Sequence, residues 1–138
     1  MNLQNQSNTL PAGTRLECYQ IENVLGVGGF GITYKAKDLN LGCNVAIKEY
    51  FPSDFSSRDS GQSVQPTLGS NKEIFDWGLD RFIREAQLLA QFKHQNIVRV
   101  MSVFELNNTA YMVMEYEQGE ELSHYYKRHK IIAEQNLL

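Results

Sequence analysis

The sequence has no excess of positive charge, no long apolar run and no basic leader at its amino terminus. Its 13 Lys and Arg against 16 Asp and Glu give a formal net charge of −3, which provides no basic field for nucleic acid or an anionic membrane. Residues 1–14 contain neither a basic segment nor an apolar stretch, so they do not form a secretion signal. No apolar stretch is long enough to span a bilayer. These absences predict a soluble, cytoplasmic chain that binds neither nucleic acid nor membrane.

Cysteine is also scarce. The two cysteines, Cys18 and Cys43, belong to no CxxC pair and to no histidine cluster, which argues against a zinc site. A disulfide between them stays an alternative, but two buried free thiols in a reducing compartment is the interpretation that we favour. The sequence therefore predicts no metal bound by this chain alone.

The chain is long enough for one domain. Its 138 residues are 42% hydrophobic and 21% charged, as in an ordinary globular protein. Residues 1–14 are polar and rich in Asn, Gln and Thr, so we expect a disordered tail there. Alternating apolar and polar residues predict five strands, at 19–25, 32–37, 44–50, 98–104 and 110–115.

One amphipathic helix is predicted over residues 73–92. Ser, Gly, Pro and Asp dominate the preceding residues 52–72, which predicts a loop, and a second helix is predicted over 120–130. This order of elements predicts an α+β fold, in which a five-stranded antiparallel sheet has a helix packed on one side. The first helix has apolar side chains at spacings of three and four residues, namely Phe75, Leu79, Phe82, Ala86 and Leu89.

Four glycines crowd the segment GVGGFGITY at residues 26–34. A hairpin turn with spare glycines is the simplest interpretation. A dinucleotide-binding fold would need a helix directly after the glycines, but ITYKAK alternates like a strand. The ATPase loop GxxxxGK[ST] would need a lysine where Ile32 stands. The functional interpretation that remains is a glycine turn between two strands, which folds over a phosphate chain and donates backbone N–H groups to it.

Lys48 and Glu85 are charged residues in apolar surroundings. Lys48 shares a strand face with Ala46 and, taken alone, is best interpreted as an edge lysine that reaches water. Glu85 lies between Phe82 and Leu89 in the apolar stripe of the helix, where a carboxylate is costly unless a cation meets it. Lys48 is the suitable cation, so we expect an ion pair between strand and helix below the glycines. The lysine would then gather the α and β phosphates of a triphosphate, while the glutamate holds the lysine.

Five segments occur in the order and with the spacing of the motifs of one known family. They are GVGGFG, VAIK (45–48), REAQLL with Glu85, KHQNIVRV and YMVMEYEQGEEL (111–122). They resemble the glycine-rich loop, the lysine strand, the αC helix, the segment after it, and the fifth strand with the hinge of a protein kinase N-terminal lobe. GGFGITY, and IKEYFP followed by an Arg-containing polar loop, further resemble bacterial serine/threonine kinases of the eukaryotic-like type.

The resemblance implies an ATP site made of an adenine pocket, a phosphate-binding loop with the predicted ion pair, and a ribose contact. Met114 would be the gatekeeper beside the adenine, and the backbones of Glu115 and Glu117 would bind the adenine edge. Glu121 matches a position that often contacts the ribose. The residues implied to bind ATP are Leu25, Gly26, Gly28, Gly29, Phe30, Gly31, Thr33, Ala46, Lys48, Met114, Glu115, Glu117 and Glu121.

The resemblance also divides the chain. After the tail 1–14, residues 15–118 would be the kinase N-terminal lobe with 52–72 as an insert, and 119–138 the hinge exit and truncated beginning of the C-terminal lobe. The family's H-R-D-x-x-x-x-N and D-F-G motifs, which position the acceptor hydroxyl and bind magnesium, do not occur in the sequence. We therefore expect Mg²⁺ only together with the missing lobe, and no useful phosphoryl transfer by this chain alone.

Three functional hypotheses follow from the resemblance. The chain is the ATP-binding portion of a serine/threonine protein kinase, which in its complete form is a signalling transferase; or it is a non-catalytic, kinase-like module that regulates a partner; or it is a decayed fragment without a selected function. The sequence names neither the protein substrate nor the partner.

Overall fold

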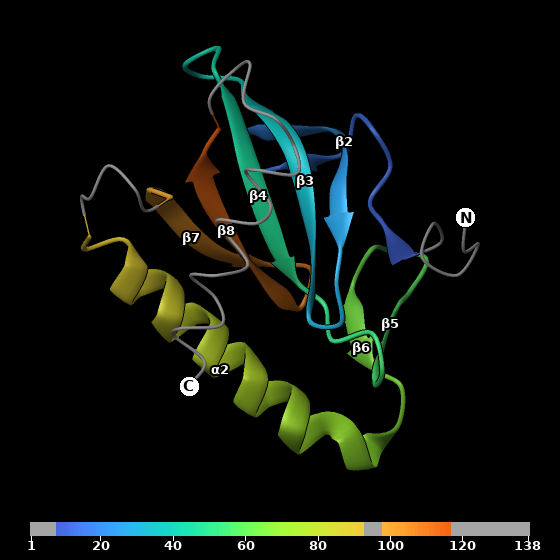
Figure 1. Cartoon of the computed structure of the whole chain (residues 1–138). Helices are drawn as coiled ribbons and strands as arrows, with labels where there is room; N and C mark the ends of the chain where they lie inside the picture. Colours follow the sequence, from blue (N-terminus) through green and yellow to red (C-terminus); the bar gives the residue numbers. More distant parts are fainter. Residues whose placement is uncertain (1–7, 93–97, 117–138) are drawn as a thin grey trace.

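The computed structural model describes residues 8–92 and 98–116 (Figure 1). No helix of this described part is long and apolar enough to cross a membrane. Several predictions fall outside it: the first seven residues of the expected tail, the helix at 120–130, the segment 119–138, and the implied ATP-binding residues Glu117 and Glu121.

The main sheet is antiparallel, and its strands follow the order β1-β2-β3-β4-β8-β7. The predicted α+β fold is confirmed, and all five predicted strands are present: β4 has the predicted bounds, and the other four have ends that differ by one or two residues. One strand was missed, because two residues are too few to show an alternating pattern. The strands are β1 Arg15–Leu16, β2 Tyr19–Val27, β3 Gly31–Asp38, β4 Asn44–Tyr50, β7 Val100–Leu106 and β8 Thr109–Glu115.

The predicted amphipathic helix is α2, Lys72–Leu89, which crosses one face of the sheet (Figure 1). Phe75, Ala86 and Leu89 of its apolar stripe are buried, as predicted. Gly78 lies in the helix interior, where glycine costs about 1 kcal/mol relative to alanine. A Cβ at Gly78 would collide with the hydroxyl of Tyr50, so close packing of α2 on β4 explains this glycine.

The insert at 52–72 is not a plain loop, and this part of the prediction was wrong. It contains a hairpin, β5 Ser56–Arg58 and β6 Val64–Pro66, and the 3-10 turn η1 Gly69–Asn71 that leads into α2. The β7–β8 turn anchors this hairpin: Val64 N donates to Asn107 O at 2.8 Å, and Asn108 Nδ2 donates to Val64 O at 2.8 Å. Tertiary contacts therefore order a segment whose composition predicts a loop.

Residues 8–14 also depart from expectation, because they pack against the sheet instead of forming a disordered tail. The side chain of Leu10 is buried with 2% exposure, and its backbone N–H donates to the hydroxyl of Tyr34 at 3.1 Å. Gly13 N donates to Ile21 O at 2.7 Å. A single leucine among polar residues carries too little pattern to predict this packing.

The cysteines are free thiols, but they are less buried than expected. Cys18 is half-buried and Cys43 is exposed. The backbones of both cysteines contact the β3–β4 turn, since Leu39 N donates to Cys18 O and Asp38 N donates to Cys43 O, each at 2.8 Å.

Strand β4 separates the two cores of the molecule, because its side chains alternate between the faces of the sheet. Ala46 belongs to the core between the sheet and α2, together with Met112 and Met114 of β8. Val45 and Ile47 belong to the core on the opposite face. The N-terminal segment and the β5–β6 hairpin contribute to this second core, so both faces of β4 are covered.

Candidate functional site

Gly31 lies directly against the strand that carries Lys48. A Cβ at Gly31 would be 2.7 Å from the carbonyl oxygen of Glu49 and 3.0 Å from Cε of Lys48. Contacts this short do not occur around real Cβ atoms, so only glycine fits here. Gly29 has no atom within 4 Å of an added Cβ. The close approach that the glycine-rich segment suggested is therefore found at Gly31 and not at Gly29.

The strand register places the predicted adenine-pocket residues on the face that carries Lys48. Thr33 is opposite Lys48 in the β3–β4 pair, and Ala46 is opposite Met114 in the β4–β8 pair. Directly opposite residues of an antiparallel pair point to the same face. Leu25 packs against the core that contains Ala46 and Met114. The structure thus brings these five residues together, whereas their contact with adenine stays a prediction.

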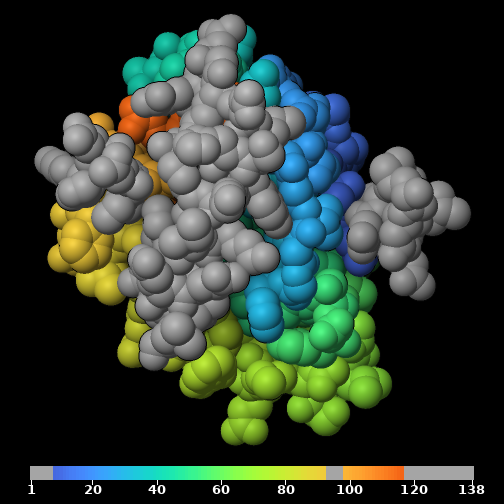
Figure 2. Space-filling view, in the orientation of Figure 1, coloured from blue at the N-terminus to red at the C-terminus, as the bar shows by residue number. Residues whose placement is uncertain are grey.

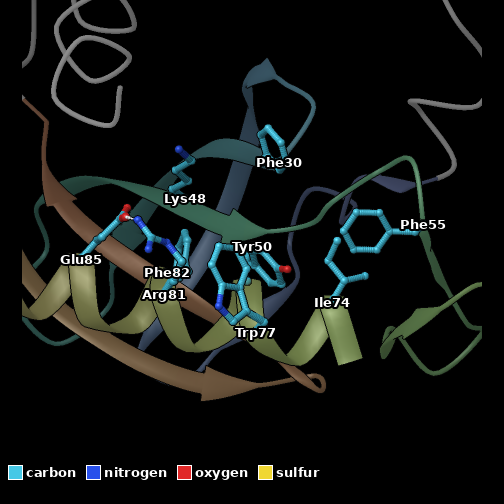
Figure 3. A pocket seen from close by; sticks show the side chains of 10 residues that line it. Phe30, Lys48, Tyr50, Phe55, Ile74, Trp77, Arg81, Phe82 and Glu85 are labelled. Carbon is cyan, nitrogen blue, oxygen red and sulfur yellow. Dashed lines mark hydrogen bonds and ion pairs between the residues drawn. The ribbon is translucent and has the colours of Figure 1, made fainter. Parts of the chain in front are cut away.

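A cavity of about 420 Å³ opens beside Lys48, between β4, the glycine segment, the insert and α2 (Figure 3). Half of its lining residues are aromatic, and its charged groups come from β4 and from α2. Its volume is in the range of sites that hold small molecules. Lining it are Phe30, Lys48, Tyr50, Phe55, Ile74, Trp77, Gly78, Arg81, Phe82 and Glu85.

The predicted direct ion pair between Lys48 and Glu85 is not formed in the part of the chain that the structure describes. Instead, Arg81 Nη2 lies 3.3 Å from Glu85 Oε1, as the dashed line in Figure 3 marks. Residues four apart on a helix are neighbours, so Arg81 reaches Glu85 without any tertiary approach. Lys48 and Glu85 nevertheless line the same cavity and influence each other's charge.

The charge of Glu85 does not fully offset the effect of burial on the Lys48 ammonium. Burial lowers the pKa of Lys48, and the nearby charge of Glu85 opposes this effect. Burial raises the pKa of Glu85, whereas Arg81 and then Lys48 lower it. A buried ammonium is stabilised by an anion placed close to it. The cavity can therefore accept an anionic group next to Lys48.

Glu49 is a buried, ion-paired acid next to Lys48 in the sequence, and we did not predict its role. It is 0% exposed, on the face of β4 opposite Lys48. Arg58 binds its carboxylate with both terminal nitrogens, at 2.6 Å and 3.1 Å. Tyr34 donates its hydroxyl to Oε1 at 2.9 Å and Tyr111 donates to Oε2 at 2.6 Å. Both carboxylate oxygens thus accept two hydrogen bonds each.

This second charged pair changes the titration of its neighbours. Burial, followed by the charge of Glu49, raises the pKa of Tyr34 and of Tyr111 well above the usual tyrosine value. Burial alone would lower the pKa of Arg58, but its hydrogen bonds and charge interaction with Glu49 together raise it. The tyrosines therefore stay protonated and keep donating to the carboxylate.

The sequence does contain a signal for Glu49. Alternation along NVAIKEY places it on one face with Val45 and Ile47, both 0% exposed, so a carboxylate on that face needs a cation. The same reasoning led to Glu85. It would not have named Arg58, because the hairpin that delivers this arginine has no pattern of its own.

Known proteins resemble the chain over most of its length. A family model described as "Protein kinase domain" matches residues 19–137. Serine/threonine-protein kinase PLK4 of Danio rerio is 29% identical over 118 residues, which are 86% of this chain and 11% of that protein. PLK4 of Drosophila yakuba is 30% identical over 114 residues, which are 82% of this chain and 12% of that protein. The chain thus spans a small part of these relatives.

A solved structure gives the same result for the fold. The structure described as "PpkA-294 apo form" superimposes with a TM-score of 0.80 and 38% sequence identity, covering 88% of this chain and 43% of that chain. The family match includes the strand of Lys48, the helix of Glu85 and the glycine segment. The chain therefore belongs to the protein kinase domain family, and its described part has the fold of the N-terminal lobe of that family.

Proposed function

We propose that this chain is the ATP-binding portion of a serine/threonine protein kinase, whose complete form transfers the terminal phosphoryl group of ATP to Ser or Thr of a protein. The observation that supports this most is the position of Lys48. Its stem passes Gly31, it lines a cavity, and among the described residues it forms no ion pair. Phosphate oxygens would supply the missing negative charge.

Within this proposal each part of the site has a task. The adenine lies between Leu25, Ala46 and Met114, while the glycine segment covers the phosphates and donates N–H groups to them. Lys48 binds the α and β phosphates, and Glu85 orients Lys48 when the bound nucleotide draws the lysine towards α2. Positioning and charge stabilisation of this kind supply most of the catalysis in phosphoryl transfer.

Other parts of the proposal concern the complete enzyme. Mg²⁺ binds together with carboxylates of a C-terminal lobe, so the chain alone binds ATP weakly and transfers no phosphate. The proposed location is the cytoplasm. The protein substrate is defined by surfaces of the complete enzyme.

A thermal-shift titration with ATP and magnesium tests the proposal. We expect a small rise in melting temperature for the 138-residue chain, and no rise for Lys48→Ala. The matched control is Lys37→Ala, which removes an exposed lysine of β3 and should respond like the unmodified chain. An equal response of Lys48→Ala and Lys37→Ala would contradict the proposed role of Lys48.

A second candidate function is a non-catalytic module that binds and regulates a partner. Exposed apolar side chains at the cavity support it, since Ile74 is 52% exposed and Trp77 is 62% exposed. Sedimentation velocity tests this candidate. A dimer that Trp77→Lys dissociates would favour it, whereas a monomer with the ATP response described above would favour the kinase portion.

A further inference from the structure

The tip of the glycine segment is held by the residues that follow β4. Phe51 N donates to Phe30 O at 3.0 Å, and Ser53 N donates to Gly29 O at 3.1 Å. In Figure 2 the green insert and the blue end of the β2–β3 hairpin lie side by side, above the yellow-green start of α2. The carbonyl groups at the tip are thereby fixed towards the insert, which restricts how far the loop can move above Lys48.

The holding segment is itself fixed by Arg58. The side chain of Phe51 is 1% exposed, and the guanidinium of Arg58 lies over its ring at 5.2 Å from the ring centre. Arg58 also donates Nε to Asn8 O at 2.8 Å and Nη1 to Gln62 O at 3.0 Å. One buried arginine therefore joins the N-terminal segment, the insert hairpin and the residue that binds the loop tip.

Glu49 connects the same arginine to the strand of the proposed phosphate-binding lysine. Glu49 and Lys48 are consecutive residues of β4, and Glu49 is held by Arg58 and two tyrosines. A buried ion pair is a poor source of net stability, because apolar residues of similar volume often stabilise as well. Its best-attested use is to select one geometry. Here the geometry that it selects is that of β4 relative to the glycine loop.

We propose that Arg58 and Glu49 are positioning residues for nucleotide binding. Their ion pair fixes Phe51 and Ser53, which hold the tip of the glycine loop over Lys48, so that the phosphate-binding donors are arranged before the nucleotide arrives. Such preorganisation reduces the ordering cost of binding. This inference rests on the proposed function, and it assigns part of the ATP affinity to a pair on the opposite face of the sheet.

Two measurements on Arg58→Met test it in the 138-residue chain. Amide hydrogen exchange without nucleotide should become faster at Phe51 and Ser53, and the Kd for ATP with magnesium should rise at least about fivefold, a typical size for coupling between sites. Leu16→Ala is the matched control, since it opens the core at edge strand β1 and leaves the pair in place. It should destabilise the fold without changing either readout once both proteins are measured well below their melting temperatures.

A pair of surface variants tests the same step where Arg58→Met fails to fold. Ser53 is exposed, so Ser53→Pro removes the N–H that binds Gly29 O without disturbing a core, and should weaken ATP binding. Ser53→Ala keeps this N–H and loses only the longer hydrogen bond of 3.4 Å from the Ser53 hydroxyl to Gly29 O, so it should bind ATP nearly like the unmodified chain. Equal ATP affinity of Ser53→Pro and Ser53→Ala would overturn the inference.

The outcomes separate the inference from the proposed function. Unchanged exchange at Phe51 and Ser53 in Arg58→Met would overturn the inference, whatever the nucleotide does. Faster exchange together with an absent ATP response in the unmodified chain would overturn the proposed function and would still support the hold on the loop. Faster exchange with weaker, Lys48-dependent binding would support both.

Discussion

Glu49 and Glu85 are two acids in apolar surroundings, and the structure treats them differently. Glu49 is completely buried and accepts four hydrogen bonds from Arg58, Tyr34 and Tyr111. The side chain of Glu85 is 20% exposed, and its ion pair is to Arg81 on its own helix. All hydrogen-bonding positions of the Glu49 carboxylate are therefore occupied. Glu85, in contrast, lines a cavity together with Lys48, which forms no ion pair within the described ranges.

This difference distinguishes a structural role for the Glu49 network from a ligand-binding role for the face that carries Lys48. A saturated, buried network has one arrangement, because any other would leave a charge without a partner. A partly exposed pair in a cavity can exchange partners at small cost, because water and the neighbouring helix turn replace what is lost. The face of β4 that carries Glu49 is therefore suited to hold geometry, and the face that carries Lys48 is suited to receive a ligand.

The largest difference in stability should appear when the cation that pairs with each acid is removed. Arg58→Met should lower the free energy of unfolding by about 3–5 kcal/mol, because it leaves Glu49 buried without its cation. Arg81→Met should cost only about 0.3–0.5 kcal/mol, as for a partly exposed pair between residues four apart on a helix. Urea unfolding of both variants measures the comparison. Equal losses would show that the two acids are not held differently.

A smaller effect should come from single tyrosine hydroxyls. Tyr111→Phe removes a 2.6 Å hydrogen bond to the buried carboxylate of Glu49 and should cost about 1.5–3 kcal/mol. Tyr50→Phe removes a 3.0 Å hydrogen bond to the neutral carbonyl of Phe75 and should cost about 0.5–1.5 kcal/mol. The same unfolding experiment orders the two variants. The reverse order would contradict the importance given to the Glu49 network.

The two glycines of the loop should also differ. Gly31→Ala places a Cβ against Glu49 O and Lys48 Cε and should cost about 1–3 kcal/mol through overpacking. Gly29→Ala enters open space and should stay within about 0.5 kcal/mol of the unmodified chain. Thermal unfolding distinguishes them. A tolerated Gly31→Ala would mean that the loop moves away from Lys48 without penalty.

The smallest effect should be a dependence of stability on pH from Lys48. Burial lowers its pKa in the folded protein below the ordinary value of 10.5. At pH values between the lowered pKa of the folded protein and the ordinary pKa of the unfolded chain, the unfolded chain binds more protons than the folded protein. The free energy of unfolding should therefore rise as the pH increases towards 10.5. Lys48→Met should lack this rise. Unfolding curves measured from neutral pH upwards test it, and parallel behaviour of the two proteins would contradict a lowered pKa of Lys48 in the folded state.

Regular patterns account for what could be predicted. Alternation predicted β4 with its bounds, and a spacing of three and four residues predicted α2 with its buried stripe. The insert at 52–72 and the segment 8–14 could not be predicted in this way. Their order depends on partners far along the chain, such as the Asn107–Asn108 turn that binds Val64.

The candidate site was also predicted only in part, for the same reason. Sequence reasoning found Lys48, Glu85 and the glycine segment, because each is out of place within a regular pattern. It paired Lys48 directly with Glu85, whereas the structure gives Glu85 to Arg81, four residues earlier on α2. Distances between a strand and a helix are not contained in either pattern, so the choice between two cations is made by packing.

By itself, the sequence determined which segments form strands and helices, which faces are apolar, and which charged residues stand in apolar places. These are local properties, carried by neighbouring residues with periods of two and 3.6. Only the tertiary structure decided which cation meets which acid, because Arg58 reaches Glu49 from a hairpin that is hydrogen-bonded to the distant β7–β8 turn. The partners of buried charges depend on how the chain folds back on itself, and no local pattern contains that information.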